Sequence, residues 1–328
     1  HLYKVDGKYL LSAAEGGTGP QHSQVILIAK SPLGPFTPHP DNPILTQRDL
    51  PEDRAEPITS VGHADFTQDS EDNWWAVFLG TRPYQGNEYN TGRETFLMPV
   101  SWDNGIPRIT KPGDVIPHVI DRPALPAQPK APLPLTGNFT YTDEFEEDVL
   151  PLHWLTVRIP AQKAYRLENG ELVLEARADG VGSPGQPSFL ARRQQHTNAE
   201  AYTEVSFVPE DSDDEAGIAA FQNDAAYYAL GLSMSEDGKA IVRLRKRAGD
   251  ATDKDGEIVA EVPAATPLGA SLKLRIVSRG PEIDFYQAAR GDDWEPVALS
   301  EDSTILSTEK AGGFVGTLLG VYAQSAGD

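Results

Sequence analysis

Acidic residues are the most numerous candidates for chemistry in this chain. It holds 49 Asp and Glu against 28 Lys and Arg, which gives a formal net charge of −21. Hydrolysis of a glycosidic acetal needs two carboxyl groups, one acting as an acid and one as a base. Most of the carboxyl groups here must lie on the solvated surface, so their number assigns none of them. Glu15 precedes the flexible pair Gly16-Gly17, where a carboxylate that supports a loop is favoured over a catalytic one.

Two further side chains stand at the starts of apolar strands. His63 follows Gly62, and a glycine permits a close approach of the backbone. His63 is either a structural histidine or a contact to a metal or substrate. Arg93 either forms a salt bridge with Glu94 or another carboxylate, or it orients a catalytic carboxylate or binds a sugar hydroxyl.

His1 raises a different possibility, because an N-terminal histidine can chelate copper in oxidative polysaccharide enzymes. That site needs a second histidine in register and normally another fold, so we set it aside. The chain has no cysteine. Disulfides, thiolate metal sites and a cysteine nucleophile are therefore excluded.

Composition and charge limit the partners. A surface with a net charge of −21 repels phosphate backbones, which argues against nucleic acid but not against a neutral polymer. Hydrophobic residues make up 39% of the chain, enough for a folded core. No apolar run reaches the roughly 18 residues that cross a membrane, and the N-terminus shows no signal segment.

Strand signals dominate the first third of the sequence. Short apolar runs bounded by turn residues predict strands over 9–14, 25–29, 74–79 and 95–100. Asp6-Gly7 lies between two such runs and predicts a tight hairpin, because this pair tolerates positive φ. No stretch keeps a capped 3.6-residue period, so no major helix is expected.

A weak internal repeat suggests how these strands are organised. Strand, acidic turn and aromatic strand occur over 2–14 and recur over 64–79, where 69–73 makes the turn. A repeat of about 65 residues fits the blades of a β-propeller. About two blades are visible, and two blades alone should be poorly stable because each buries its faces against neighbours.

The second part of the chain has a different pattern. Residues 111–138 are proline-rich and predict a linker over a surface. Regular alternation then resumes and predicts an antiparallel sandwich, with strands over 172–174, 201–207, 217–221, 227–232, 241–244, 272–277, 283–286 and 313–322. The predicted fold is all-β, with propeller blades over 1–112, a linker over 113–138 and a sandwich over 139–328.

Several segments, in order and spacing, resemble the later blades of the five-bladed propeller of glycoside hydrolase family 43. They are 1–4, 9–18, 31–36, 42–46, 61–65, 74–75 and 92–95. The sandwich resembles the concanavalin-A-like C-terminal domain of that family's β-xylosidases and arabinofuranosidases. Its matching pieces are 143–145, 152–154, 190–194 and 312–316. The resemblance covers nearly the whole chain.

The resemblance implies an inverting mechanism with a base, an acid and an aspartate that tunes the pKa of the acid. The two aspartates belong to earlier blades. The acid is the glutamate of a Glu-Gly-Pro-His-type motif, whose histidine corresponds to His1. We therefore expect the general acid just before His1 and no catalytic carboxylate within this chain. No cofactor is expected for the chemistry.

The resemblance also assigns binding residues. Arg93 matches the arginine of the sugar-binding subsite, and Thr18 matches a threonine on the glycine loop at the pocket. His63 matches a histidine near the channel centre that often helps to hold a calcium ion or its water shell. Such an ion would be bound mostly through oxygen and water. Substrate contacts are thus expected at Arg93, His63, Thr18 and His1, and a structural Ca²⁺ at His63.

One departure from the family bears on specificity. In many of its β-xylosidases, adjacent phenylalanines on a sandwich loop close the pocket, whereas the matching stretch 195–199 reads Gln-His-Thr-Asn-Ala. An open pocket suits an enzyme that must admit a polymer backbone. The expected activity is an exo-acting α-L-arabinofuranosidase on arabinoxylan side chains. A β-xylosidase on xylo-oligosaccharides is the close alternative.

Other classes stay open. The chain could be a non-catalytic carbohydrate-binding fragment. It could also pair with a second chain that carries the first blades. A propeller whose chain is cut between strands can stay assembled, because the hydrogen bonds between strands and the contacts between blades remain. The expected partners are arabinoxylan or xylo-oligosaccharides and an N-terminal fragment of the same enzyme. An extracellular, secreted location is expected, with a cytoplasmic one as the alternative.

Overall fold

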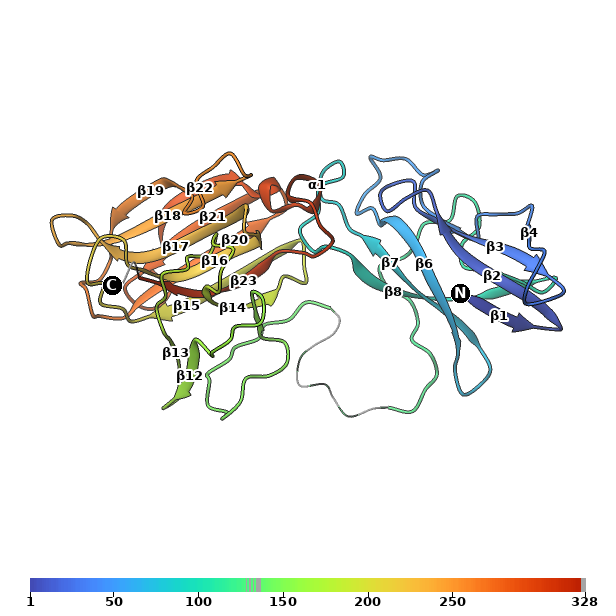
Figure 1. Cartoon of the computed structure of the whole chain (residues 1–328), viewed down its shortest axis with the longest axis horizontal. Helices are drawn as coiled ribbons and strands as arrows, with labels where there is room; N and C mark the ends of the chain where they lie inside the picture. The colour runs from blue at the N-terminus through green and yellow to red at the C-terminus, as the bar shows by residue number, and fades with distance from the viewer. Residues whose placement is uncertain (128, 130, 132, 134–136, 326–328) are drawn as a thin grey trace. The chain divides into compact units, whose positions relative to one another are not determined.

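The computed structural model describes residues 1–127, 129, 131, 133 and 137–325 (Figure 1). The chain divides into two compact units. Unit 1 consists of His1–Asn87 and Arg93–Gly137, and unit 2 consists of Glu88–Gly92 and Asn138–Asp328. Part of the predicted proline-rich linker, namely 128, 130, 132 and 134–136, lies outside the described residues.

Unit 1 begins with a five-stranded antiparallel sheet. Its strands are β1 (Leu2–Val5), β2 (Lys8–Glu15), β3 (Ser23–Ala29), β4 (Thr37–Pro38) and β5 (Leu45–Thr46). The predicted hairpin is confirmed: Val5 pairs with Lys8, and Asp6 and Gly7 have φ values of 48° and 75°. Two positive φ angles are what a two-residue type I′ turn requires.

A second sheet of unit 1 contains β6 (Thr59–Gln68), β7 (Trp74–Thr81) and β8 (Glu94–Pro99), all antiparallel, and a hairpin of β9 (Ser101–Asp103) and β10 (Ile106–Arg108) follows it. The acidic turn over 69–73 joins β6 to β7, as predicted. The Asp69 carboxylate fixes this turn because it accepts hydrogen bonds from the Asn73 backbone N–H and from Trp75 Nε1, both at 3.0 Å.

Alternation along these strands builds one core. Leu10 of β2, Ile26 of β3, Val61 of β6 and Phe78 of β7 are at most 2% exposed and belong to a single apolar cluster. Because side chains on a strand alternate between faces, their neighbours point to the opposite side. Two small antiparallel sheets around one core are consistent with blades of a propeller.

Unit 2 contains two larger sheets (Figure 1). One has seven strands in the order β11-β14-β23-β16-β17-β18-β19, and the other has four in the order β15-β20-β21-β22. The bounds of the first sheet are β11 (Leu155–Thr156), β14 (Ser188–Arg193), β23 (Leu318–Gln324), β16 (Glu215–Asn223), β17 (Ala226–Met234), β18 (Ala240–Ala248) and β19 (Glu257–Pro263). Those of the second are β15 (Asn198–Val205), β20 (Leu272–Arg279), β21 (Glu282–Ala288) and β22 (Glu295–Asp302). A hairpin of β12 (Tyr165–Glu168) and β13 (Glu171–Leu174), a 3₁₀ turn η1 (Ser303–Leu306) and helix α1 (Thr308–Ala311) complete the described unit.

The two sheets of unit 2 enclose the main core of a sandwich. Tyr228 and Leu230 of β17 meet Leu274 and Ile276 of β20 and Phe285 of β21, all fully buried. This arrangement confirms the all-β prediction and the concanavalin-like sandwich. Within the described residues, none of the helices has the length and apolar character needed to cross a bilayer.

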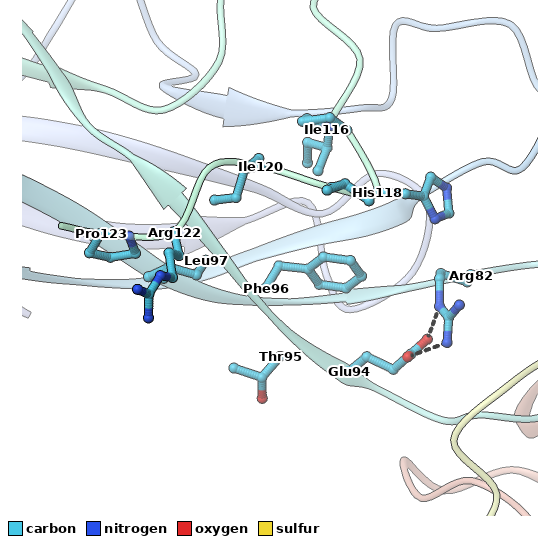
Figure 2. Close-up of a pocket in the computed structure, with 12 residues that line it drawn as sticks. Arg82, Glu94, Thr95, Phe96, Leu97, Ile116, His118, Ile120, Arg122 and Pro123 are labelled. Carbon is cyan, nitrogen blue, oxygen red and sulfur yellow. Dashed lines mark hydrogen bonds and ion pairs between the residues drawn. The ribbon is translucent and has the colours of Figure 1, made fainter. Parts of the chain in front are cut away.

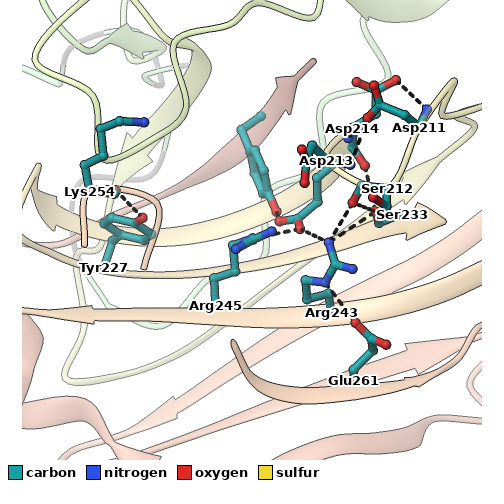
Figure 3. A network of polar contacts seen from close by, with 12 residues as sticks. Asp211, Ser212, Asp213, Asp214, Tyr227, Ser233, Arg243, Arg245, Lys254 and Glu261 are labelled. Carbon is teal, nitrogen blue, oxygen red and sulfur yellow. Dashed lines mark hydrogen bonds and ion pairs between the residues drawn. The ribbon is translucent and has the colours of Figure 1, made fainter. Parts of the chain in front are cut away.

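A buried ionic network lies on the other face of the seven-stranded sheet (Figure 3). Glu215 is fully buried and accepts hydrogen bonds from Tyr322 Oη and from Arg245 Nε, the latter at 3.1 Å. Arg243 Nη1 lies 3.8 Å from the same carboxylate, and its Nε lies 3.0 Å from Glu261. Burial raises the pKa of Glu215, while Arg245 and the Tyr322 hydroxyl oppose that rise.

Five residues that lie between β7 and β8 in the sequence belong to unit 2. Asn90 is 1% exposed, and its carbonyl accepts a hydrogen bond of 2.8 Å from the Thr317 backbone N–H. Gly92 packs so closely that a Cβ there would lie 2.3 Å from the Gly316 nitrogen. Glu88–Gly92, which precede Arg93 in the chain, are thus held by the segment that leads into β23.

Some predicted strand limits were wrong. The strand predicted over 313–322 begins only at Leu318. The residues before it are excluded from the strand because Gly312 and Gly313 have φ values of 79° and 76°, and Thr317 is bound to Asn90 instead. The strand predicted over 201–207 spans Asn198–Val205. Strands β14, β19 and β22 were not predicted.

Candidate functional site

Strand β6 is irregular where it carries His63. Its register against β7 shifts between Thr59 and Gly62 and again between Gly62 and Asp65. Ser60 and His63 both have a φ of 56°, in the left-handed region that non-glycine residues rarely adopt. Bulges of this kind re-aim side chains. Here His63 is exposed although Gly62 and Ala64 on either side are buried.

His22, which the sequence analysis did not single out, is buried and packs against Gly62. It is 3% exposed, and a Cβ at position 62 would lie 2.6 Å from its Cε1 and Nε2 atoms. The predicted close approach at Gly62 is therefore confirmed. His22 Nδ1 lies 2.9 Å from the Ser60 carbonyl oxygen, which can only accept. Nδ1 thus carries the hydrogen, and Nε2 carries the lone pair.

Electrostatics connect His22 to two of the predicted residues. Burial lowers the pKa of His22 most, the hydrogen bond to Ser60 opposes this, and electrostatic interactions with Arg93 and His63 lower the pKa further. The imidazole therefore stays neutral at neutral pH. Arg93 and His63 therefore both lie within electrostatic range of this buried ring.

Arg93 is half-buried and stands directly before β8. Glu94, its neighbour, accepts two hydrogen bonds from the Arg82 guanidinium, Nε to Oε1 at 2.8 Å and Nη2 to Oε2 at 2.7 Å (Figure 2). A bidentate pair of this geometry fixes both side chains. It anchors the start of β8, the strand that begins one residue after Arg93.

His1 lies next to His63. Its ring centroid is 6.2 Å from that of His63, and its Nδ1 is 3.0 Å from Asp65 Oδ1. Asp65 also accepts a hydrogen bond of 3.2 Å from Tyr3 Oη. Asp65 thus holds His1 next to His63, a role that the sequence analysis did not assign.

Thr18 lies on the loop that joins β2 to β3. Gly16 closes this loop, because a Cβ there would lie 2.0 Å from the Gln21 carbonyl oxygen and its φ is 77°. Thr18 is exposed on the loop, which ends at His22. Within the described part of the chain, no hydrogen bond joins Thr18 to His63 or Arg93, so its role at the pocket stays a prediction.

Glu15 contacts groups that support the same loop. Its Oε1 accepts a hydrogen bond of 3.2 Å from Ser23 Oγ and lies 3.5 Å from Arg48 Nη1. These contacts agree with the favoured interpretation of Glu15 as a supporting carboxylate.

A calcium ion at His63 would need oxygen ligands from backbone carbonyls, amides or water in addition to carboxylates. Among the described residues, no three His, Asp or Glu side chains come together in a way that could hold a metal ion. His63 contributes a ring nitrogen, whereas calcium prefers six to eight oxygen ligands. Calcium at His63 stays a prediction, and no step of the chemistry is assigned to a metal.

A cavity of about 420 Å³ lies elsewhere in unit 1, between β8 and the segment over 116–123 (Figure 2). Arg82, Glu94, Phe96 and His118 are among the residues that line it. Neither His63 nor Arg93 is among them. The candidate site therefore rests on the cluster of His1, His22, His63 and Arg93, not on this cavity.

The cluster is suited to binding polar, uncharged groups. It contains the Arg93 guanidinium, the exposed imidazoles of His1 and His63, which donate and accept hydrogen bonds, and the neutral buried ring of His22. The carboxylate within it, Asp65, is engaged by His1 and Tyr3. Among the described residues around His63 we assign no pair of carboxyl groups of the kind that acetal hydrolysis uses. The cluster can hold a hydroxylated ligand.

Comparisons with known proteins agree with this chemistry. The model described as "Glycosyl hydrolases family 43" matches residues 1–107, and that described as "Beta xylosidase C-terminal Concanavalin A-like domain" matches residues 142–328. A non-reducing end α-L-arabinofuranosidase of Bacteroides ovatus is 34% identical over 100% of this chain and 59% of its own length. A xylosidase/arabinosidase of Butyrivibrio fibrisolvens is 32% identical over 100% of this chain and 60% of its own length.

Solved structures give the same result. A Bacteroides ovatus protein described as xyloglucan PUL GH43B superposes with a TM-score of 0.86 and 32% identity, over 100% of this chain and 62% of that one. The GH43 protein BlXynB of Bacillus licheniformis gives a TM-score of 0.85 and 30% identity, over 100% and 61%. The chain thus spans about three fifths of the length of the proteins it matches.

Proposed function

This chain belongs to glycoside hydrolase family 43, and on that premise we propose that unit 1 carries the sugar-binding part of an exo-acting, inverting α-L-arabinofuranosidase. The substrate is the arabinose side chains of arabinoxylan. The observation that carries the proposal is the placement of the His1 ring 6.2 Å from that of His63. His63 is next to Gly62 on the buried His22, and Arg93 lies within electrostatic range of His22.

The geometry supports recognition of a neutral sugar. His63 is exposed and sits on a strained backbone, which is common where a side chain must be aimed at a ligand. Arg93 supplies up to five N–H donors, and a guanidinium keeps its charge at all relevant pH values. A terminal sugar offers several adjacent hydroxyl oxygens to such donors.

The preference for arabinose is supported by the stretch 195–199, which contains no phenylalanine. Within unit 2 this stretch is held in place, since Gln194 Nε2 donates to the His196 carbonyl at 2.9 Å. The His196 ring also stands edge-on to Phe139 at 5.3 Å. A 34%-identical relative that is named an α-L-arabinofuranosidase supports the same preference.

A β-xylosidase is the second candidate, because another relative is named a xylosidase/arabinosidase. For either activity we propose that this chain acts together with the part of a family 43 fold that it does not match. That part would supply the general acid, the base and the tuning aspartate. It would be provided by an associated N-terminal fragment or by one continuous protein.

In the test, the chain is combined with a fragment that carries the N-terminal residues of a family 43 enzyme. Arabinoxylan is the substrate. Chromatography of the released sugars should show arabinose without xylose, and NMR of the first product should show an inverted anomeric centre. Release of xylose without arabinose would favour the β-xylosidase. The 328-residue chain assayed alone is the control, and native mass spectrometry reports whether the two parts associate.

A further inference from the structure

The outer face of the four-stranded sheet in unit 2 carries a row of rings that the proposed function does not use. Leu274 and Ile276 of β20 point into the core, so Arg275 between them points outward. Arg275 pairs directly with Tyr202 of β15 on one side and with Tyr286 of β21 on the other. One row of side chains therefore crosses three neighbouring strands.

Trp294 completes the row, which we call the aromatic row: Tyr202, Arg275, Tyr286 and Trp294. The Trp294 ring centroid lies 6.3 Å from that of Tyr202, at an interplanar angle of 64°. The Arg275 guanidinium lies 5.2 Å from the Trp294 centroid and 5.9 Å from that of Tyr286. These contacts hold the rings in fixed orientations, so a ligand would meet a preorganised surface.

Tyr202 is the exposed member of the aromatic row, whereas Arg275, Tyr286 and Trp294 are half-buried. Tyr202 is 56% exposed although it lies in the middle of a strand. A large exposed ring in a regular strand offers apolar surface to a ligand, while its hydroxyl remains available for hydrogen bonds.

The charges around the row already have partners, which limits the ligand. Arg275 forms an ion pair with Glu200, and Lys273 Nζ donates to the Gly291 carbonyl at 3.0 Å. The Tyr286 hydroxyl donates to Asp284 at 3.2 Å. The charge of Arg275 is therefore already neutralised by Glu200, and a chain of net charge −21 repels anionic polymers.

A neutral polysaccharide fits both properties. The C–H faces of a pyranose ring stack on aromatic rings, and its hydroxyls hydrogen-bond to carboxylates and tyrosine hydroxyls at the edges. Tyr202 and Tyr286 lie two strand spacings apart, about 9.6 Å, which is the scale of two linked pyranose rings. If an apolar protein surface docked on the row instead, it would remove water from the Arg275–Glu200 ion pair, and desolvating an ion pair is costly.

We propose that the aromatic row is a second carbohydrate-binding surface, separate from the cluster at His63, that takes a neutral chain of linked pyranose rings. The choice of xylan as that chain rests on the proposed function, whereas the binding of a pyranose polymer does not. Such a surface would hold the polymer without cleaving it.

The test uses the full 328-residue chain and measures its retardation by soluble arabinoxylan in affinity electrophoresis. Tyr202→Ala and Trp294→Ala should each weaken retention at least tenfold. Tyr202→Phe keeps the ring and should stay within threefold of the wild type. Ile258→Ala, which removes an exposed apolar side chain from the other sheet, is the matched control and should not change retention. Circular dichroism checks that each variant is folded.

Equal retention of the wild type and Tyr202→Ala would overturn the proposal, as would a wild type that no neutral β-linked polysaccharide retards. Retention by another such polysaccharide, lost in Tyr202→Ala, would keep the surface and remove only xylan as its ligand. If Tyr202→Ala abolished self-association in size-exclusion chromatography but left retention unchanged, the row would be a protein contact and the proposal would fail.

Discussion

The imidazole of His22 lies directly against the Cα of Gly62, with no room for a side chain between them. A Cβ at position 62 would come within 2.6 Å of two ring atoms of His22. Electrostatic interactions with Arg93 and His63 lower the pKa of the same ring. This one contact therefore fixes the buried part of the candidate site.

Replacing Gly62 tests that contact. Gly62→Ala should lower the free energy of unfolding of the chain by about 1–3 kcal/mol, because overpacking of a tight interior forces the ring or the strand to move. Urea denaturation measures the change. Gly19→Ala is the control, since a Cβ there meets nothing within 4 Å. Equal stability of the two variants would mean that β6 can yield and that the contact is not rigid.

The protonation of His22 should make stability depend on pH. Its pKa in the folded chain lies below the ordinary value of 6.5, so the unfolded chain binds the proton more readily. The stabilisation is complete above pH 6.5 and is lost as the pH falls towards the folded pKa. The slope from this one group cannot exceed about 1.4 kcal/mol per pH unit.

Two measurements check this pH dependence. The difference in unfolding free energy between pH 7.5 and 5.5 should be smaller in His22→Gln than in the wild type. An NMR titration of the His22 ring in the wild-type chain reports the pKa directly. A midpoint above 6.5 would contradict the prediction.

The buried Glu215 should be the most sensitive charge of unit 2. Glu215→Gln leaves Arg243 and Arg245, whose side chains are 8% and 14% exposed, without their shared carboxylate. Breaking such a buried pair costs about 3–5 kcal/mol. Glu261→Gln removes a partner of Arg243 that is 41% exposed and should cost at most about 1 kcal/mol. Similar urea midpoints for the two variants would show that the network contributes little.

Local patterns were enough to predict part of this molecule. The Asp6-Gly7 turn, the alternation of β2 and β7 and the glycine before His63 each depend on neighbouring residues. The strands of β16, β17 and β20 were predictable for the same reason. The family resemblance, and not any spacing in the sequence, assigned Arg93 to a sugar-binding subsite and His63 to the channel centre. The buried ring of His22, on which both act, was not predicted.

The missed features depend on residues that are far apart in the chain. His22 binds the carbonyl of Ser60, and Asp65 binds His1, so neither partner is visible from a local window. Glu215 looked like one more acid in an acidic stretch, and only the folded sheet places it between Arg245 and Tyr322. Strand β19 was missed because its charged residues mask the alternation.

The central claim is that Arg93 binds the sugar that is cleaved. The most direct measurement is kcat/KM for a 4-nitrophenyl α-L-arabinofuranoside, with the chain supplied with the N-terminal residues of a family 43 enzyme. Arg93→Ala should lower kcat/KM at least about 100-fold, because charge-assisted hydrogen bonds to the substrate are lost. Arg108→Lys, which alters an arginine paired with Asp41, should stay within about twofold of the wild type. An Arg93→Ala protein that is folded and as active as the Arg108→Lys control would contradict the claim.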